Sequence, residues 1–124
     1  MANTIVWADI PVTDMESARR FYGALLQAEV ASMEGAESRV ALLPSERGDV
    51  SADLALSEDR KPSTDGATVY FGSKGDIEGM AARAVEAGGK ILTPPTDMGE
   101  MVGTIAYVLD SEGDRIGLHT PPQR

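Results

Sequence analysis

The sequence repeats one pattern of apolar and helical segments at half its length, and this repeat restricts the possible folds more than any other feature. Residues 4–12 form an apolar, β-branched run that is followed, from Asp14, by a helical pattern. Residues 67–73 form a second such run, followed from Asp76 by a second helical pattern. The two aspartates stand 62 positions apart (76 − 14), which is half of the 124 residues. Two tandem copies of one supersecondary unit are expected to produce this spacing.

Each copy of the repeat contains one expected helix. The first spans residues 14–27 and the second residues 76–87, with apolar side chains spaced three and four apart as on one helix face. These side chains are Met15, Ala18, Phe21, Tyr22 and Leu25 in the first helix and Ile77, Met80, Ala81, Ala84 and Val85 in the second. Thr13 and Glu16 have the spacing of a capping box at the first helix start. Gly88 and Gly89 suit a helix end that needs a positive φ.

Short strands separated by turn residues are expected after each helix. They cover residues 29–33, 39–43 and 50–56 in the first copy and residues 90–93, 103–110 and 115–120 in the second. The last two are joined by a turn in which Gly113 supplies a positive φ. Pro94 and Pro95 are expected to be irregular, and the polar segment 57–66 connects the two copies.

The order of elements is therefore β-α-β-β-β, twice. It predicts an α+β fold in which two tandem βαβββ modules form a curved mixed sheet around a cleft. We expect one domain of residues 1–124, with module one covering about residues 1–60 and module two about residues 61–124.

Composition narrows the class of protein. With 42% apolar and 25% charged residues, the chain has the make-up of an ordinary globular domain. No stretch approaches the roughly 18 apolar residues that cross a bilayer, and the first residues lack the basic and apolar regions of a secretory signal. The absence of cysteine excludes disulfides, thiol nucleophiles and thiolate metal sites. It is typical of a cytoplasmic protein.

The charge balance restricts the partners. The chain has 11 Lys+Arg against 20 Asp+Glu, a net charge of −9. A surface this acidic repels phosphate backbones, so we expect neither a nucleic acid nor a membrane as partner. The acidic surface favours a cationic ligand, or it serves only to keep the protein soluble.

Three segments resemble a known family. Residues 6–22 read VWADIPVTDMESARRFY and resemble the opening strand and helix of vicinal oxygen chelate proteins, which include glyoxalase I, extradiol dioxygenases and bleomycin-resistance proteins. Residues 66–92 read GATVYFGSKGDIEGMAARAVEAGGKIL and are similar to the opening of their second module. Residues 103–121 read GTIAYVLDSEGDRIGLHTP and resemble their closing hairpin. The resemblance covers nearly the whole chain and implies the fold, but activities vary widely within this family.

The resemblance also implies where metal ligands would stand, because metal-using members place them on the cavity face of the first and last strand of each module. By that register the first position falls on Trp7, the second near Asp53, the third on Val69 or Tyr70, and the fourth on Gly117. Neither Trp7 nor Gly117 has a side chain that binds a divalent metal.

The number of histidines also argues against a metal site. The family's glyoxalase I and extradiol dioxygenase sites use two histidines each, whereas His119 is the one histidine of this chain. We therefore expect no cofactor and disfavour a divalent metal.

Asp9 and His119 are the candidate catalytic residues. Alternate residues of a strand share a face, so Asp9 shares a face with Trp7, and His119 shares one with Gly117. By the resemblance, these faces line one cavity, where a carboxylate would orient an imidazole as a general base. The alternatives are a hydrogen bond from loop amides to Asp9 and a surface position for His119.

Other residues are candidates for binding a ligand. Trp7, Tyr70 and Phe71 would supply aromatic wall, Asp53 a carboxylate, and Arg115 a cation for an anionic substrate. The alternatives are a core position for Phe71 and a solvated position for Arg115. The hydroxyl of Tyr107 would need a partner if buried. The other face of the outer strands should pack under the helices with Val6, Ile10, Val12, Ile116 and Leu118.

These observations favour three functions. The first is a glyoxalase-like protein that binds a small organic molecule without the family's metal site, with or without metal-independent catalysis. The second is a sequestering protein for a cationic compound, like the bleomycin-resistance proteins. The third is an atypical metalloenzyme, a lyase, isomerase or dioxygenase relative, that recruits Asp9, His119 and Asp53. The resemblance and the exposed sheet edges both favour a homodimer.

Overall fold

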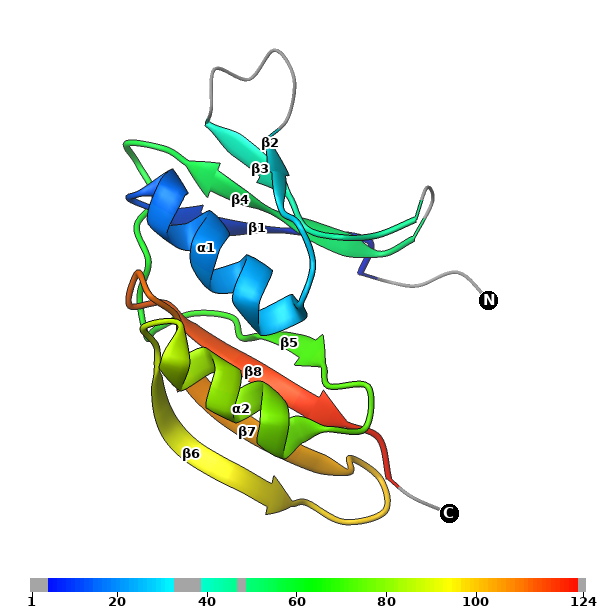
Figure 1. Cartoon of the computed structure of the whole chain (residues 1–124). Helices are drawn as coiled ribbons and strands as arrows, with labels where there is room; N and C mark the ends of the chain where they lie inside the picture. The colour runs from blue at the N-terminus through cyan, green and yellow to red at the C-terminus, as the bar shows by residue number, and fades with distance from the viewer. Residues whose placement is uncertain (1–4, 33–38, 47–48, 123–124) are drawn as a thin grey trace.

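The structure, a computed structural model, describes residues 5–32, 39–46 and 49–122. Along these residues the elements are β1 (Trp7–Val12), α1 (Met15–Leu26), β2 (Ala31–Ser32), β3 (Val40–Leu42), β4 (Ser51–Leu56), β5 (Val69–Gly72), α2 (Ile77–Glu86), β6 (Lys90–Asp97), β7 (Thr104–Leu109) and β8 (Arg115–Thr120). The βαβββ order occurs twice, as predicted from the repeat, and the two modules lie one above the other in Figure 1.

Each module folds into a mixed sheet of four strands. The strand orders are β1-β4-β3-β2 and β5-β8-β7-β6. The first and last strands of each module run parallel, and the remaining neighbours run antiparallel. Each helix packs on its own sheet, and α1 and α2 also contact each other (Figure 1). The helices therefore cover one face of each sheet and leave the opposite face uncovered.

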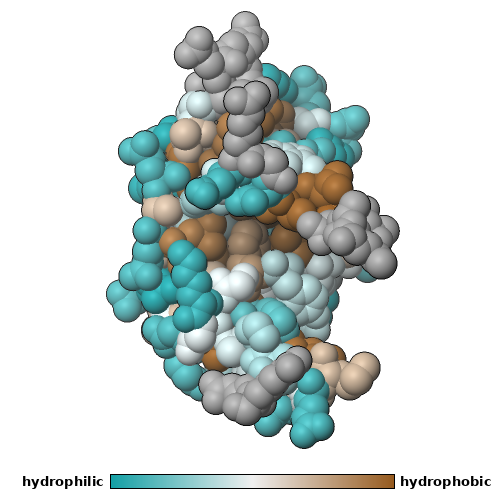
Figure 2. All heavy atoms as spheres, turned by 90° about the vertical axis from the view of Figure 1, so that its right-hand side faces the viewer, coloured by the Kyte–Doolittle hydropathy of each residue, from teal (hydrophilic) through white to brown (hydrophobic). Residues whose placement is uncertain are grey.

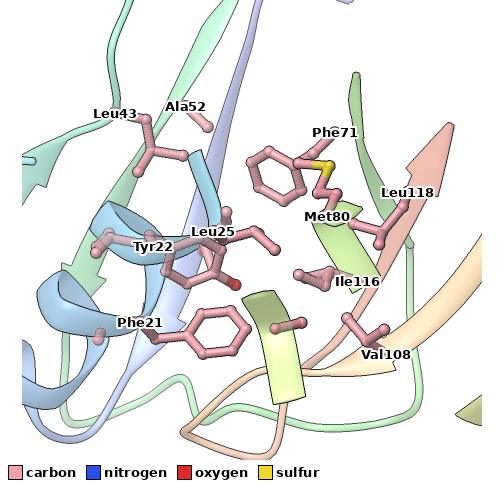
Figure 3. Packing of buried hydrophobic residues seen from close by; sticks show 14 of the residues in the cluster. Phe21, Tyr22, Leu25, Leu43, Ala52, Phe71, Met80, Val108, Ile116 and Leu118 are labelled. Carbon is pink, nitrogen blue, oxygen red and sulfur yellow. The ribbon is translucent and has the colours of Figure 1, made fainter. Parts of the chain in front are cut away.

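A single cluster of buried side chains extends through both modules (Figure 3). The ring of Tyr22 on α1 lies 5.0 Å from that of Phe21 and 5.6 Å from that of Phe71 on β5. The side chain of Phe71 is 9% exposed, so its packing matches the core alternative considered for it.

The alternation of the outer strands is confirmed except at one position. Ile10 and Val12 of β1 and Ile116 and Leu118 of β8 are all buried, under the helices. Val6 was expected beside them but is 63% exposed, because β1 begins only at Trp7 and Val6 lies before the paired segment.

The start of α1 differs from the predicted capping box. The N-cap is Asp14, whose carboxylate accepts a hydrogen bond from the amide of Ser17 at 3.1 Å. Thr13 donates its amide and its hydroxyl to Glu112, at 2.8 and 2.9 Å, and Glu16 takes no part. The helix begins one residue later than expected because Asp14 is the stronger local acceptor and Thr13 has a partner in the other module.

Two further predictions, both in the region from α2 to β6, are wrong. Val85 was expected in the apolar stripe of α2 but is exposed, because it lies about 100° round the helix from Ala84, at the edge of the buried stripe. Strand β6 continues through Pro94 and Pro95, which were expected to be irregular. Register shifts on both sides of Thr93 interrupt the pairing of this edge strand, so residues without an amide hydrogen are tolerated there.

The remaining elements agree with the sequence within a few residues. Gly88 and Gly113 have φ values of +102° and +89°, as their turn positions required. Strand β2 is shorter than the expected segment 29–33, and Met33 lies outside the described residues. Neither helix of the described chain has the length and apolar character needed to cross a membrane.

Candidate small-molecule site

A groove of about 530 Å³ lies between the two modules, beside the edge strands β1 and β5. Figure 2 shows hydrophobic residues gathered across the middle of this side of the molecule, between its upper and lower parts. The side chains at the groove are predominantly apolar and aromatic, and they include Trp7, Ala8, Val50, Ala52, Tyr70 and Phe71. A groove of this volume and lining is typical of sites that bind small organic molecules.

Trp7 and Tyr70 stand at the rim of the groove, one from each module. Their side chains are 43% and 47% exposed, which is high for large aromatic residues on a sheet. The indole Nε1 of Trp7 donates a hydrogen bond to Oδ2 of Asp53 on the neighbouring strand β4, at 3.0 Å. This bond ties the indole ring to β4 while the side chain of Trp7 stays partly exposed.

Asp9 and Asp53 lie side by side on the uncovered face of the first sheet, because the parallel register of β1 and β4 pairs them. Burial raises the pKa of Asp53, the neighbouring Asp9 raises it further, and the hydrogen bond from Trp7 opposes both. Oδ1 of Asp53 is buried without a hydrogen-bond partner, the one such side-chain atom among the described residues. The second oxygen of Asp53 thus lacks a donor that would stabilise its charged form.

Asp9 has a cationic partner in the segment that connects the modules. Nη1 of Arg60 lies 3.4 Å from Oδ2 of Asp9, and both side chains are largely exposed. Sequence analysis did not single out Arg60, because an arginine in a polar connecting segment carries no local signal of its partner.

On the second sheet, Tyr70 and Tyr107 share a hydrogen bond of 2.5 Å between their hydroxyl groups. Tyr70, Gly117 and Tyr107 are consecutive neighbours across β5, β8 and β7. A Cβ atom at Gly117 would lie 2.4 Å from the ring of Tyr70, so the absence of a side chain there lets the ring lie on the backbone. The guanidinium of Arg115 stands 4.1 Å above the ring of Tyr107.

His119 is bound to the loop between β6 and β7. Its Nε2–H donates to the carbonyl oxygen of Val102 at 2.7 Å, and because a carbonyl only accepts, the proton belongs on Nε2. Asp9 lies on the first sheet and His119 on the second, and no hydrogen bond or ion pair joins the two side chains.

The divalent metal that the fold family implies does not fit the residues present. Of the four positions named above, Trp7 offers an indole N–H that is already donated to Asp53, and Gly117 has no side chain. Within the part of the chain that the structure describes, no three His, Cys, Asp or Glu side chains gather closely enough to hold a metal ion.

The family of the chain follows from comparison with known proteins. A model of the Glyoxalase/Bleomycin resistance protein/Dioxygenase superfamily matches residues 4–118. The chain therefore belongs to this superfamily, as its three segments predicted. A search of curated proteins found no match.

Solved structures of the same superfamily share the fold. A glyoxalase/bleomycin resistance protein from Albidiferax ferrireducens T118 matches with a TM-score of 0.75 and 21% identity, over 94% of this chain and 98% of that one. A glyoxalase-related enzyme from Fulvimarina pelagi matches at 0.73 and 16%, over 95% and 88%. The fosfomycin resistance protein FosX from Mesorhizobium loti matches at 0.64 and 19%, over 97% and 93%. At such identities the likeness establishes the two-module fold and leaves the activity to be argued from the site.

Proposed function

We propose that this protein binds a small organic molecule in the groove between β1 and β5, without a bound metal. The observation that carries the proposal is the pair of half-exposed aromatic rings, Trp7 and Tyr70, at the rim of an apolar groove of about 530 Å³. Sites for small molecules commonly enclose about 300–1,000 Å³ and combine such walls with a few polar groups. The polar side chains that line this groove are Ser51, Thr68 and Tyr70, and the carboxylates of Asp9 and Asp53 lie outside its lining, on the first sheet.

Fluorescence of Trp7, the one tryptophan of the chain, tests the proposal directly. Titration with small aromatic compounds should quench or shift its emission to saturation. Ala67→Leu enlarges a side chain that lines the groove and should weaken binding. Ala24→Leu, on the exposed side of α1, is the matched control and should leave it unchanged. Equal effects of the two substitutions would place the ligand elsewhere.

Metal analysis tests the second half of the proposal. Protein purified without chelator should contain substoichiometric Zn, Ni, Fe and Mn, and its ligand affinity should survive dialysis against a strong chelator. Stoichiometric metal, or loss of binding after dialysis, would favour the atypical metalloenzyme built on Asp9, Asp53 and His119 instead.

A second candidate function is sequestration of a cationic compound. The adjacent carboxylates of Asp9 and Asp53 favour it, since the buried Oδ1 of Asp53 accepts no hydrogen bond and the chain has a net charge of −9. Attraction between exposed charges is screened within about 10 Å at 0.1 M salt. Affinity for a cationic aromatic compound should therefore fall with ionic strength if this function holds.

We also propose that the protein is a homodimer in which the exposed sheet edges of the two copies meet. Support comes from the edges of β1 and β5, each of which pairs with one strand alone in the described chain, and from the rings of Trp7 and Tyr70. In such a dimer Asp9 of one copy could approach His119 of the other, as catalysis by this pair would require.

Engineered cysteines provide the test, because the chain contains none of its own. A variant with both Asp9→Cys and His119→Cys should form disulfide-linked dimers on mild oxidation, and light scattering of the unmodified protein should give twice the chain mass. Each single-cysteine variant is the control. A monomeric mass would exclude the dimer, and absence of cross-linking in a dimer would exclude the pairing of these two residues.

A further inference from the structure

We infer that the uncovered face of the second sheet holds a binding site for an anionic group, formed by Arg115, Tyr107 and Tyr70 at the edge of the groove. The inference rests on the proposed function and names the chemistry of its ligand: an apolar body with a carboxylate or another oxyanion attached.

Two contacts hold the guanidinium of Arg115 in place. It stacks on the ring of Tyr107 at 4.1 Å, and its Nη1 donates to Oγ1 of Thr68 at 3.0 Å. These two contacts fix the plane of the guanidinium and use only part of its five N–H donors. The remaining donors are thus held in place before any ligand binds, which lowers the entropy cost of binding an anion.

Arg115 has no carboxylate in an ion pair with it among the described residues. The chain carries 20 Asp and Glu residues against 11 Lys and Arg, so carboxylates are abundant. Among the described residues, however, the ion pairs are Arg19 with Glu16 and Arg60 with Asp9. The contacts of the Arg115 guanidinium within the described chain are the hydroxyl of Thr68 and the ring of Tyr107, and neither contact is with a carboxylate.

The hydroxyl groups of Tyr70 and Tyr107 belong to the same cluster as Arg115. When Tyr70 and Tyr107 share one hydrogen bond, the hydroxyl that accepts it keeps its own proton free for another acceptor. The bond with Tyr107, together with burial, raises the pKa of Tyr70, so the phenol remains a neutral donor. Guanidinium and phenol donors with no carboxylate among them are complementary to an oxyanion.

This cluster is connected to the groove through Tyr70. Tyr70 belongs to both, since its side chain also lines the groove. Its ring lies over Gly117, where any Cβ atom would meet it at 2.4 Å. The ring is thereby kept flat at the boundary, with its hydroxyl toward Tyr107 and Arg115. A molecule with its apolar part in the groove could therefore reach the donors with an anionic substituent.

Three naphthalene probes of similar size test the inference: 1-naphthoate, 1-naphthalenemethanol and 1-naphthylmethylamine. Binding is followed by chemical-shift changes in ¹⁵N-labelled protein, which locate each probe, and by calorimetry. We expect naphthoate to bind more tightly than the alcohol and the amine. Arg115→Gln should lower the affinity for naphthoate by about tenfold or more, which is the usual effect of losing a hydrogen bond to a charged group. The affinity for the alcohol should stay unchanged.

Two variants complete the design. Arg20→Gln removes the same charge from the exposed side of α1 and should leave all three affinities unchanged. Tyr107→Phe keeps the ring under Arg115 and removes the hydroxyl. It should weaken the binding of naphthoate and leave the binding of the alcohol and the amine unchanged. The Tyr107→Phe variant also tests the anion site if Arg115→Gln fails to fold.

The outcomes separate the two proposals. If naphthoate and the alcohol bind equally in the groove, or if Arg115→Gln and Arg20→Gln weaken naphthoate equally, the anion site is wrong and the small-molecule groove stands. If no probe shifts the signals of residues along β1 and β5, the groove proposal itself is wrong, and the anion site is overturned with it.

Discussion

The hydroxyl of Tyr22 donates a hydrogen bond of 2.6 Å to Oδ2 of Asp110, and so joins helix α1 of the first module to the turn between β7 and β8 of the second. Both side chains are buried. Oδ1 of Asp110 accepts from the amides of Glu112 and Asp114 at 2.8 and 2.9 Å. A carboxylate inside the shared core thus accepts three hydrogen bonds, and one of them comes from the other module.

Tyr22→Phe should lower the free energy of unfolding by about 1–3 kcal/mol, because Asp110 would keep its burial and lose a donor. Urea unfolding followed by circular dichroism measures the change. Tyr70→Phe, which removes the hydroxyl of an exposed tyrosine, is the matched control and should cost less. Equal losses would mean that the bond to Asp110 contributes nothing beyond an exposed one.

The contribution of Glu112, which caps the start of α1, to the stability of the protein should also be measurable. Oε1 of Glu112 accepts from the amide and hydroxyl of Thr13 and from the amide of Asp14, at 2.6–2.9 Å. Loss of a helix cap typically costs about 0.5–2 kcal/mol, so Glu112→Ala should destabilise the protein by about that amount. Glu100→Ala, at an exposed position, should have little effect. A Glu112 variant as stable as the control would contradict the role of this contact.

The raised pKa of Asp53 should make the stability of the protein depend on pH in an unusual direction. Burial and the neighbouring Asp9 raise its folded-state pKa above the ordinary value of 3.8. In the window above 3.8 the folded state therefore holds more protons than the unfolded state, so the contribution of Asp53 to stability falls as pH rises through that window. Asp53→Asn removes this titration and supplies an amide donor next to Asp9. We expect the variant to be more stable than the parent at pH 7 and to have a smaller fall in stability with rising pH.

Urea unfolding at intervals between pH 4 and pH 8 checks this expectation. Asp65→Asn, at an exposed aspartate, controls for the change in net charge. If Asp53→Asn is the less stable protein at neutral pH, the unpartnered oxygen is not a source of destabilisation.

Gly117→Ala should separate the tyrosine pair without affecting the core. The new Cβ atom would lie 2.4 Å from the Tyr70 ring, and because that side chain is half-exposed it can swing away. Naphthoate affinity should then fall, with a smaller effect on the alcohol. Ala24→Leu, on the exposed side of α1 and outside the lining of the groove, should change neither affinity. Unchanged ring signals of Tyr70 in the Gly117 variant would refute this account.

Local alternation could be predicted from the sequence because it depends on near neighbours. Ile10 and Val12 face the helices while Trp7 and Asp9 face away, as the two-residue period of a strand requires. Where the local signal was ambiguous the prediction failed. Thr13 and Asp14 both suit an N-cap, and the choice between them depended on Glu112, about a hundred positions away in the chain.

The sequence by itself determined the two βαβββ modules, the side of each outer strand that is buried, and the family. Only the tertiary structure decided the partners on the uncovered faces: Asp9 beside Asp53 and Arg60, Tyr70 against Tyr107, and the guanidinium of Arg115 over an aromatic ring. The physical reason is that periodicity records only which face a residue occupies. Which side chain lies opposite depends on strand register and on the packing of one module against the other, and these are set by many weak contacts between distant parts of the chain.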